Sequence, residues 1–111
     1  MNIAAASPVD LLHAVSDSSR LRLLRALMRE ELNVQELVRV LESRQPSVSR
    51  HLAVLRKAGW VEQRREGTYS WYRATPAGSL DGREDLRRVV GALTDALPEA
   101  RGDDERLATV I

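Results

Sequence analysis

Cysteine is absent from this chain of 111 residues, and so is phenylalanine. The lack of cysteine excludes disulfide bonds, thiolate nucleophiles and metal sites with sulfur ligands. No apolar run approaches the length that crosses a bilayer, and no basic residue precedes a hydrophobic stretch at the N-terminus. We therefore expect neither a membrane span nor a signal peptide, and we expect a cytoplasmic location.

The charge of the chain is balanced in total but uneven along the sequence. There are 17 basic and 16 acidic residues, which gives a net charge of +1. Residues 20–73 carry a net charge of +6, whereas residues 1–19 carry −2 and residues 74–111 carry −3. A basic centre of this kind fits a solvated surface and a nucleic-acid-binding face equally well.

Composition and length indicate one compact domain and argue against a two-domain enzyme. Hydrophobic residues make up 43% of the chain, as is typical of globular proteins. Periodic apolar residues predict a first helix over residues 9–16 and a second that begins at Asp17 or Ser18. The arginines of this second helix, at positions 20, 22 and 25, fit a solvated face. Arg20, at the start of the helix, fits a contact with phosphate or with an acid of a partner subunit equally well.

A helix-turn-helix is predicted over residues 33–58. Asn33 and Glu36 have the spacing of a capping box, which predicts the start of a third helix. A proline is tolerated only in the first turn of a helix, so Pro46 predicts a fourth helix beginning at about Gln45. Gly59 suits a left-handed C-cap at the end of that helix.

The pattern after residue 59 changes from helical to alternating. Residues 60–73 predict two strands about a glycine-containing turn, and residues 81–97 return to a helical pattern. Residues 99–111 form either a C-terminal tail or the start of a further helix, beyond a domain of residues 1–98. The fold class is therefore mostly α with a small β-hairpin, a winged helix-turn-helix.

This architecture places the fourth helix in the major groove of a duplex. Short polar side chains and arginine near the start of such a helix suit base edges and phosphates, and basic residues of the hairpin suit the DNA backbone. The candidate DNA-binding residues are Gln45, Ser47, Ser49, Arg50, His51 and Lys57 on the helix, and Arg64, Arg65 and Thr68 on the hairpin.

Several segments, taken in order, resemble the ArsR/SmtB family of bacterial winged-helix repressors. They are residues 18–24, 31–37, 45–52, 55–59 and 64–67, with Tyr72 and Arg73. The resemblance implies a repressor that binds a pseudo-palindromic operator as a homodimer, joined by the helices over residues 9–16 and 81–97. Its implied interface residues are Leu11, Leu12, Leu86, Val89, Val90 and Leu93.

The sequence departs from the metal-sensing members of that family. The segment from Leu32 to Leu37 lacks the cysteine pair of the arsenic- and cadmium-sensing members, and residues 81–97 lack the histidine used by the zinc-sensing members. We therefore expect no metal site and no bound cofactor. The resemblance extends to members linked to S-adenosylmethionine metabolism, which implies an effector similar to S-adenosylhomocysteine.

Other functions remain open at this stage. Ser47 and His51 could form a catalytic pair, but no third group accompanies them, so we expect no enzyme and assign His51 to packing or a phosphate contact. His13 fits an interface or the core, and with so few aromatic residues we expect Trp71 and Trp60 in the core. The chain could also be a protein-docking module or the regulatory domain of a larger methyltransferase-type protein.

Overall fold

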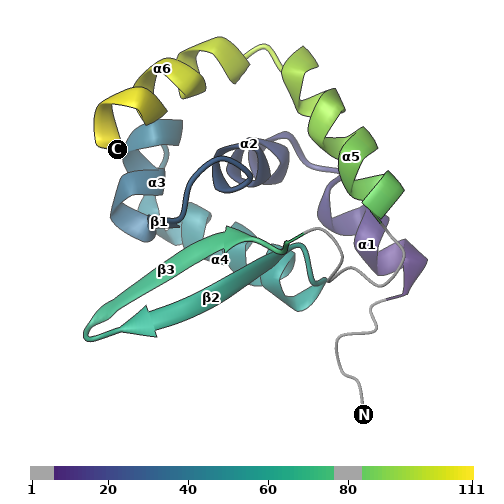
Figure 1. Cartoon of the computed structure of the whole chain (residues 1–111), viewed down its shortest axis with the longest axis horizontal. Coiled ribbons are helices and arrows are strands. Elements are labelled where there is room, and N and C mark those ends of the chain that lie inside the picture. Colours follow the sequence, from purple (N-terminus) through teal and green to yellow (C-terminus); the bar gives the residue numbers. More distant parts are fainter. Residues whose placement is uncertain (1–6, 77–83) are drawn as a thin grey trace.

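The computed structural model of the chain describes residues 7–76 and 84–111. Figure 1 shows α2 at the centre of a ring formed by α1, α3, α5 and α6, with a β-hairpin on one side. In chain order the elements are α1 (Pro8–Ala14), α2 (Ser18–Leu27), β1 (Leu32–Asn33), α3 (Val34–Leu41), α4 (Gln45–Lys57), β2 (Val61–Glu66), β3 (Tyr69–Ala74), α5 (Glu84–Leu93), a 3-10 turn η1 (Thr94–Ala96) and α6 (Ala100–Val110).

The predicted helix ends are confirmed by local hydrogen bonds. The backbone N–H of Glu36 donates to Asn33 Oδ1 at 2.9 Å, and the N–H of Asn33 donates to Glu36 Oε1 at 3.0 Å, which completes the capping box. Asp17 caps α2 by accepting from the N–H of Arg20. Helix α4 begins at Gln45, and Gly59 directly after it has a φ of +91°, which suits glycine.

The sheet contains the predicted hairpin and one further strand. Strands β2 and β3 pair antiparallel, and the two-residue strand β1 joins the other edge of β3, so the order is β1-β3-β2. Within β1, Leu32 is buried and lies opposite Tyr72. Two residues are too few for an alternating pattern to appear, which is why the sequence analysis did not predict this strand.

The core forms where the helices meet the base of the hairpin. Val48, Leu52 and Leu55, spaced along one side of α4, are all buried. Trp60 is also buried, and its indole Nε1–H donates to the carbonyl of Leu11 at 2.9 Å. The expectation for Trp71 was wrong, because it is only half-buried on the outer face of the hairpin with its ring 6.3 Å from that of Tyr69.

The C-terminal part differs from the single helix predicted over residues 81–97. Within the described residues α5 ends at Leu93, and the chain tightens into η1 before Pro98; residues 81–83 lie outside the described ranges. Helix α6 then packs against α2 and α3. The boundary expected at residue 98 thus separates two helices of one packed unit.

Arginines of α2 bind the carboxylates of these C-terminal elements, so a purely solvated face is the wrong interpretation for two of them. Arg22 forms a two-point contact with the buried carboxylate of Asp103, with both distances 2.8 Å, and also donates to the carbonyl of Leu41 at 2.9 Å. Arg106 of α6 donates to Asp103 and to the carbonyl of Val40. These bonds join α2 and α6 to the end of α3.

Arg25 is the most deeply buried arginine of this cluster, with 7% of its surface exposed. Its guanidinium donates to both carboxylate oxygens of Asp104, at 2.7 and 3.1 Å, and to Asp95 and the Thr94 hydroxyl of η1. We call Arg22, Arg25, Asp95, Asp103 and Asp104 the α2–α6 ion-pair cluster. None of the helices in the described ranges combines the length and apolar character needed to cross a membrane.

Replacing Arg25 by alanine should lower the free energy of unfolding by about 2 kcal/mol. This is below the cost of breaking a fully buried ion pair, because the carboxylates of Asp95 and Asp104 keep contact with water. Arg101→Ala, which breaks an exposed pair with Glu105, is the matched control and should cost less than about 0.5 kcal/mol. Urea unfolding at one protein concentration measures both; equal losses would contradict a structural role for Arg25.

The same cluster predicts a pH dependence of stability. Hydrogen bonds and charge from Arg25, and secondarily from Arg29, hold the pKa of Asp104 below its usual range. A lowered folded-state pKa contributes stability that is complete above the unfolded value and is lost as the pH falls below about 4. Asp104→Asn should therefore reduce the fall of the urea unfolding midpoint between about pH 5 and about pH 3. Glu105→Gln should keep the wild-type profile.

Candidate nucleic-acid interface

Helix α4 presents one polar face to solvent and buries the opposite face. Its turn from α3 is tight, with Glu42 in the left-handed conformation at a φ of 50°. No acidic residue occurs in α4, so nothing on this helix repels a polyanion. Of the predicted residues on this helix, Gln45, Ser49, Arg50 and Lys57 are exposed. Ser47, expected in the exposed first turn, is half-buried, and so is His51.

The start of α4 carries one cation that was not among the predicted residues. Arg44 occupies the N-cap position of α4, is exposed, and makes no ion pair within the described part of the chain. Its position directly before Gln45 could have indicated this, because the residue before a recognition helix lies where that helix enters the groove. In the first turns of the helix, Arg50 Nη2 lies 3.5 Å from Ser47 Oγ, so Ser47 lies beside Arg50.

His51 lies on the inner side of this face and contacts Arg20. Its Nδ1 atom is 3.2 Å from Arg20 Nη1. Burial lowers the pKa of His51, and the charges of Arg20 and Arg50 lower it further against the opposing effect of Asp17. The imidazole is therefore neutral near pH 7. Ser47 and His51 form no hydrogen bond among the described residues, so the structure gives no support to a catalytic pair.

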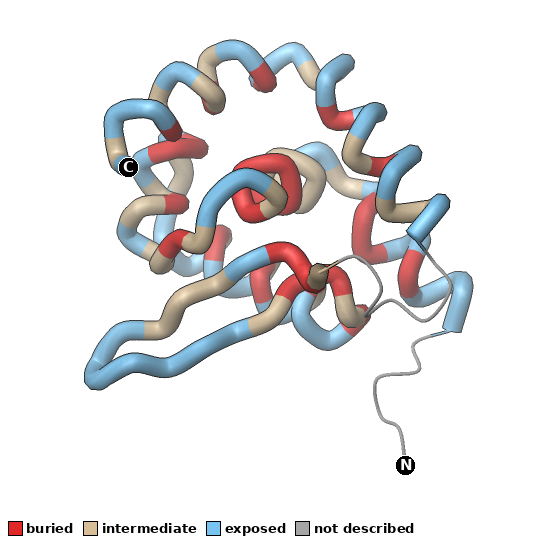
Figure 2. Tube along the Cα trace, viewed as in Figure 1, coloured by how far each residue is buried: buried red, intermediate tan, exposed pale blue. Residues whose placement is uncertain are grey.

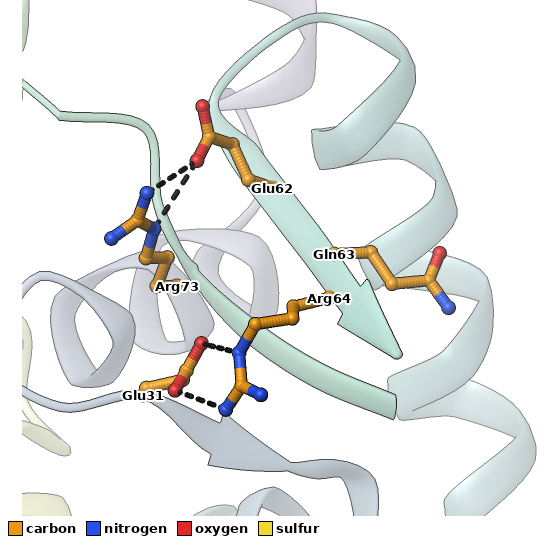
Figure 3. Close-up of a pocket in the computed structure, with 5 residues that line it drawn as sticks. All are labelled: Glu31, Glu62, Gln63, Arg64 and Arg73. Atoms are coloured by element: carbon orange, nitrogen blue, oxygen red, sulfur yellow. Dashed lines mark hydrogen bonds and ion pairs between the residues drawn. The ribbon is translucent and has the colours of Figure 1, made fainter. Parts of the chain in front are cut away.

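The hairpin has two chemically different faces because successive side chains of a strand alternate. Arg64 lies on the outer face and donates to both carboxylate oxygens of Glu31, at 2.8 and 3.1 Å, and to Glu66 at 3.3 Å. Beside it Arg73 pairs with Glu62. Figure 3 shows these two ion pairs, whose residues line a hollow with a volume of about 270 Å³.

Arg64 thus has a different environment from the one expected of a phosphate contact. Its hydrogen bonds hold the pKa of Glu31 below the usual range, and they join the hairpin to the residue that precedes β1. Glu31 was not predicted as part of the site. It is 33 residues from Arg64 in sequence, so only the pairing of β1 with β3 brings the two side chains together.

Arg65 lies on the opposite face of β2, in register with Ser70 and on the side where Val61 enters the core. It is exposed and has no ion-pair partner among the described residues. Thr68 is exposed in the tip beside Gly67, whose φ of 62° allows the tight turn. Figure 2 shows this projecting part of the hairpin exposed to solvent, so Arg65 and Thr68 are accessible to a ligand.

The predicted interface residues divide into two groups. Leu11 and Val90 are buried in the core of the single chain, and Leu86 is half-buried against it. In contrast, Leu12, Val89 and Leu93 are 54%, 49% and 60% exposed, and Val9 on α1 is 74% exposed. The exposed residues of α1 and α5 are those available to a partner. His13 is exposed too, so of the two expected locations the core is excluded and the interface remains a prediction.

These features define a winged helix-turn-helix, in which α3 and α4 form the helix-turn-helix and β2 and β3 form the wing. A model of the bacterial regulatory protein arsR family matches residues 17–63. The HTH-type transcriptional regulator Rv2034 of Mycobacterium tuberculosis is 38% identical over 101 residues, covering 88% of this chain and 94% of the relative. The chain belongs to the ArsR family.

Solved structures agree with this assignment. The crystal structure of the transcriptional repressor BigR from Xylella fastidiosa aligns with a TM-score of 0.65 at 33% identity, covering 79% of this chain and 83% of that one. The homodimeric winged helix-turn-helix DNA-binding domain Mb0332 from Mycobacterium bovis aligns with a TM-score of 0.64 at 26% identity, covering 82% and 78%. Of several further curated relatives, the chain spans between 50% and 62% of the length.

Proposed function

We propose that this chain is a homodimeric transcriptional repressor that binds a pseudo-palindromic operator by placing α4 in the major groove. The observation that carries the proposal is the polar, acid-free face of α4 above its buried apolar stripe. Family membership supports DNA binding, and the homodimeric Mb0332 domain supports two copies. Half-sites then lie about one helical turn, or a multiple of it, apart, and occlusion of the promoter represses transcription.

In this proposal the side chains have separate roles. Gln45, Ser47, Ser49 and Arg50 read bases in the major groove, whereas Lys57, Arg65 and Thr68 contact the DNA backbone. Arg64 positions the wing through Glu31 instead of touching phosphate, since two carboxylates already accept its hydrogen bonds. The chain works by binding, not by catalysis, in the cytoplasm where its operator lies.

Arg50→Ala should weaken operator binding by roughly 10-fold to 100-fold and reduce the preference for operator over random duplex. Arg65→Ala should weaken both duplexes alike and reduce the salt slope by about 1, because it removes a phosphate contact. Arg64→Ala is the matched control on the neighbouring residue and should leave the salt slope unchanged. Fluorescence anisotropy with the DNA upstream of the chain's own coding region measures all three variants at several salt concentrations.

An equal loss for Arg50→Ala on operator and random duplex would contradict base reading by Arg50. A wild-type chain that binds no duplex even at low salt would overturn the proposal and favour a docking module. We further propose an effector that is not a metal, because the chain has no cysteine and residues 81–97 contain no histidine. Adding S-adenosylhomocysteine or zinc to the same assay tests this, and release by zinc would contradict it.

The exposed residues of α1 and α5 predict where the partner subunit packs. Leu93→Glu introduces a charge twice into a twofold interface, so the dimer should dissociate at least about tenfold more readily. Ile111→Glu is the matched control, because Ile111 is 66% exposed and lies away from α1 and α5 at the end of the chain. Sedimentation equilibrium measures both; an unchanged dimer for Leu93→Glu would contradict this interface.

A further inference from the structure

Arg20 of α2 contacts two other helices through one guanidinium group. Its Nε–H donates to the carbonyl of Ala14 at 2.6 Å, and Nη2 donates to the carbonyl of His13 at 3.4 Å, both at the end of α1. Its Nη1 atom lies 3.2 Å from His51 Nδ1 on α4. One side chain of α2 therefore joins the C-terminal end of α1 to the middle of the recognition helix.

The contact between Arg20 and His51 determines which ring nitrogen carries the proton. A guanidinium has only N–H donors, so His51 Nδ1 must accept with its lone pair. The proton of the neutral ring then resides on Nε2. A doubly protonated ring would place two N–H groups against each other and would lose this hydrogen bond.

The charged groups that face His51 come from two helices. Asp17 is the N-cap residue of α2, Arg20 lies within α2, and Arg50 belongs to α4. From α1, the carbonyls of His13 and Ala14 accept from the Arg20 guanidinium, which keeps it in place. Two positive charges against one negative charge favour the neutral ring, in agreement with the acceptor role of Nδ1.

His51 lies at the border between the core side and the outward face of α4. It is half-buried, next to the buried Leu52 on one side and the exposed Arg50 on the other. It also lies one helical turn after Ser47. Within the described residues Nε2 has no hydrogen-bond partner, so its N–H is the unused polar group of this ring.

We propose that Arg20 is a positioning residue that fixes His51 as an Nε2–H donor to a backbone phosphate of the duplex. The inference rests on the proposed function and adds a contact that is neutral, unlike those of Lys57 and Arg65. Because Arg20 also binds the end of α1, it couples the exposed α1 face to the orientation of α4. His51 then contributes to affinity through a directional hydrogen bond. Because the ring is neutral, it contributes nothing to the release of counterions on binding.

The tautomer is measured first, in the free protein without DNA. A long-range 1H–15N correlation spectrum of the wild-type chain at neutral pH should show His51 with its proton on Nε2. Exposed His13 gives an internal reference in the same spectrum and should show a mixture of tautomers. Arg20→Gln should shift His51 towards such a mixture. Wild-type His51 with its proton on Nδ1 would overturn the proposal.

DNA binding is measured next, with variants that separate charge from hydrogen bonding. His51→Leu and Arg20→Gln should each weaken binding to operator and random duplex by about tenfold, and the double variant should be no weaker than either. His51→Gln keeps an acceptor and a donor, so it should retain affinity within about twofold. Arg20→Lys keeps the charge, but its single nitrogen cannot span the acceptors that three separate guanidinium nitrogens reach, so affinity should fall at an unchanged salt slope.

Thermal unfolding of each variant accompanies these measurements, and the His51→Gln rescue distinguishes a lost contact from lost folding. Additive losses in the double variant, or full affinity in His51→Leu, would overturn the phosphate contact. A wild-type chain that binds no duplex would overturn the proposed function and this contact together. The tautomer spectrum separates the two cases, because it reports on Arg20 and His51 in the absence of DNA.

Discussion

The matching of buried positive charge on α2 by carboxylates from the C-terminal elements constrains the rest of this structure. Taking a guanidinium such as that of Arg25 out of water costs roughly several kcal/mol, and ion pairs and hydrogen bonds in the folded state must offset this desolvation cost. Arg25 receives acceptors from Thr94, Asp95 and Asp104, and the described residues contain no buried side-chain polar atom without a partner. Arg22 binds Asp103 and Arg25 binds Asp104, so two adjacent residues of α6 are each held by a different arginine of α2. The ion pairs therefore define the register of α6 on α2, while apolar burial supplies most of the stability.

Helix α2 links α4, the proposed recognition helix, to α1 and α5, whose exposed apolar residues are proposed to face a partner subunit. Through Arg22 it binds the last carbonyl of α3, and through Arg20 it binds both the end of α1 and His51 on α4. Arg25 ties the same helix to η1, directly after α5. In a dimer joined by α1 and α5, the spacing of the two recognition helices is thus set by contacts of one central helix. A rigid spacing of this kind suits an operator whose half-sites have a constant separation.

The wing shows how a nearly neutral chain can leave positive charge on one face of a hairpin. The outer face of the hairpin neutralises Arg64 and Arg73 with Glu31 and Glu62, whereas the opposite face leaves Arg65 without an ion-pair partner in the described ranges. Net charge along the sequence cannot show this division, because it counts all arginines equally. Strand alternation puts Arg64 and Arg65 on opposite faces of the hairpin. Only the complete sheet, with its third strand β1, shows which of these faces carries the carboxylates.

Local sequence determined the helix-turn-helix of this protein and the exposed face of α4. The capping box at Asn33, the position of Pro46, the glycine at 59 and the apolar stripe of α4 act within a few residues, so they can be interpreted without the fold. Tertiary structure alone decided which charged side chains are paired within the chain, which apolar side chains are buried, and which of both remain exposed to a ligand or partner. Arg25 meets Asp95 and Asp104 across 70 and 79 residues, and Arg20 meets His51 across 31. Such pairs depend on how whole helices pack, which no local pattern encodes.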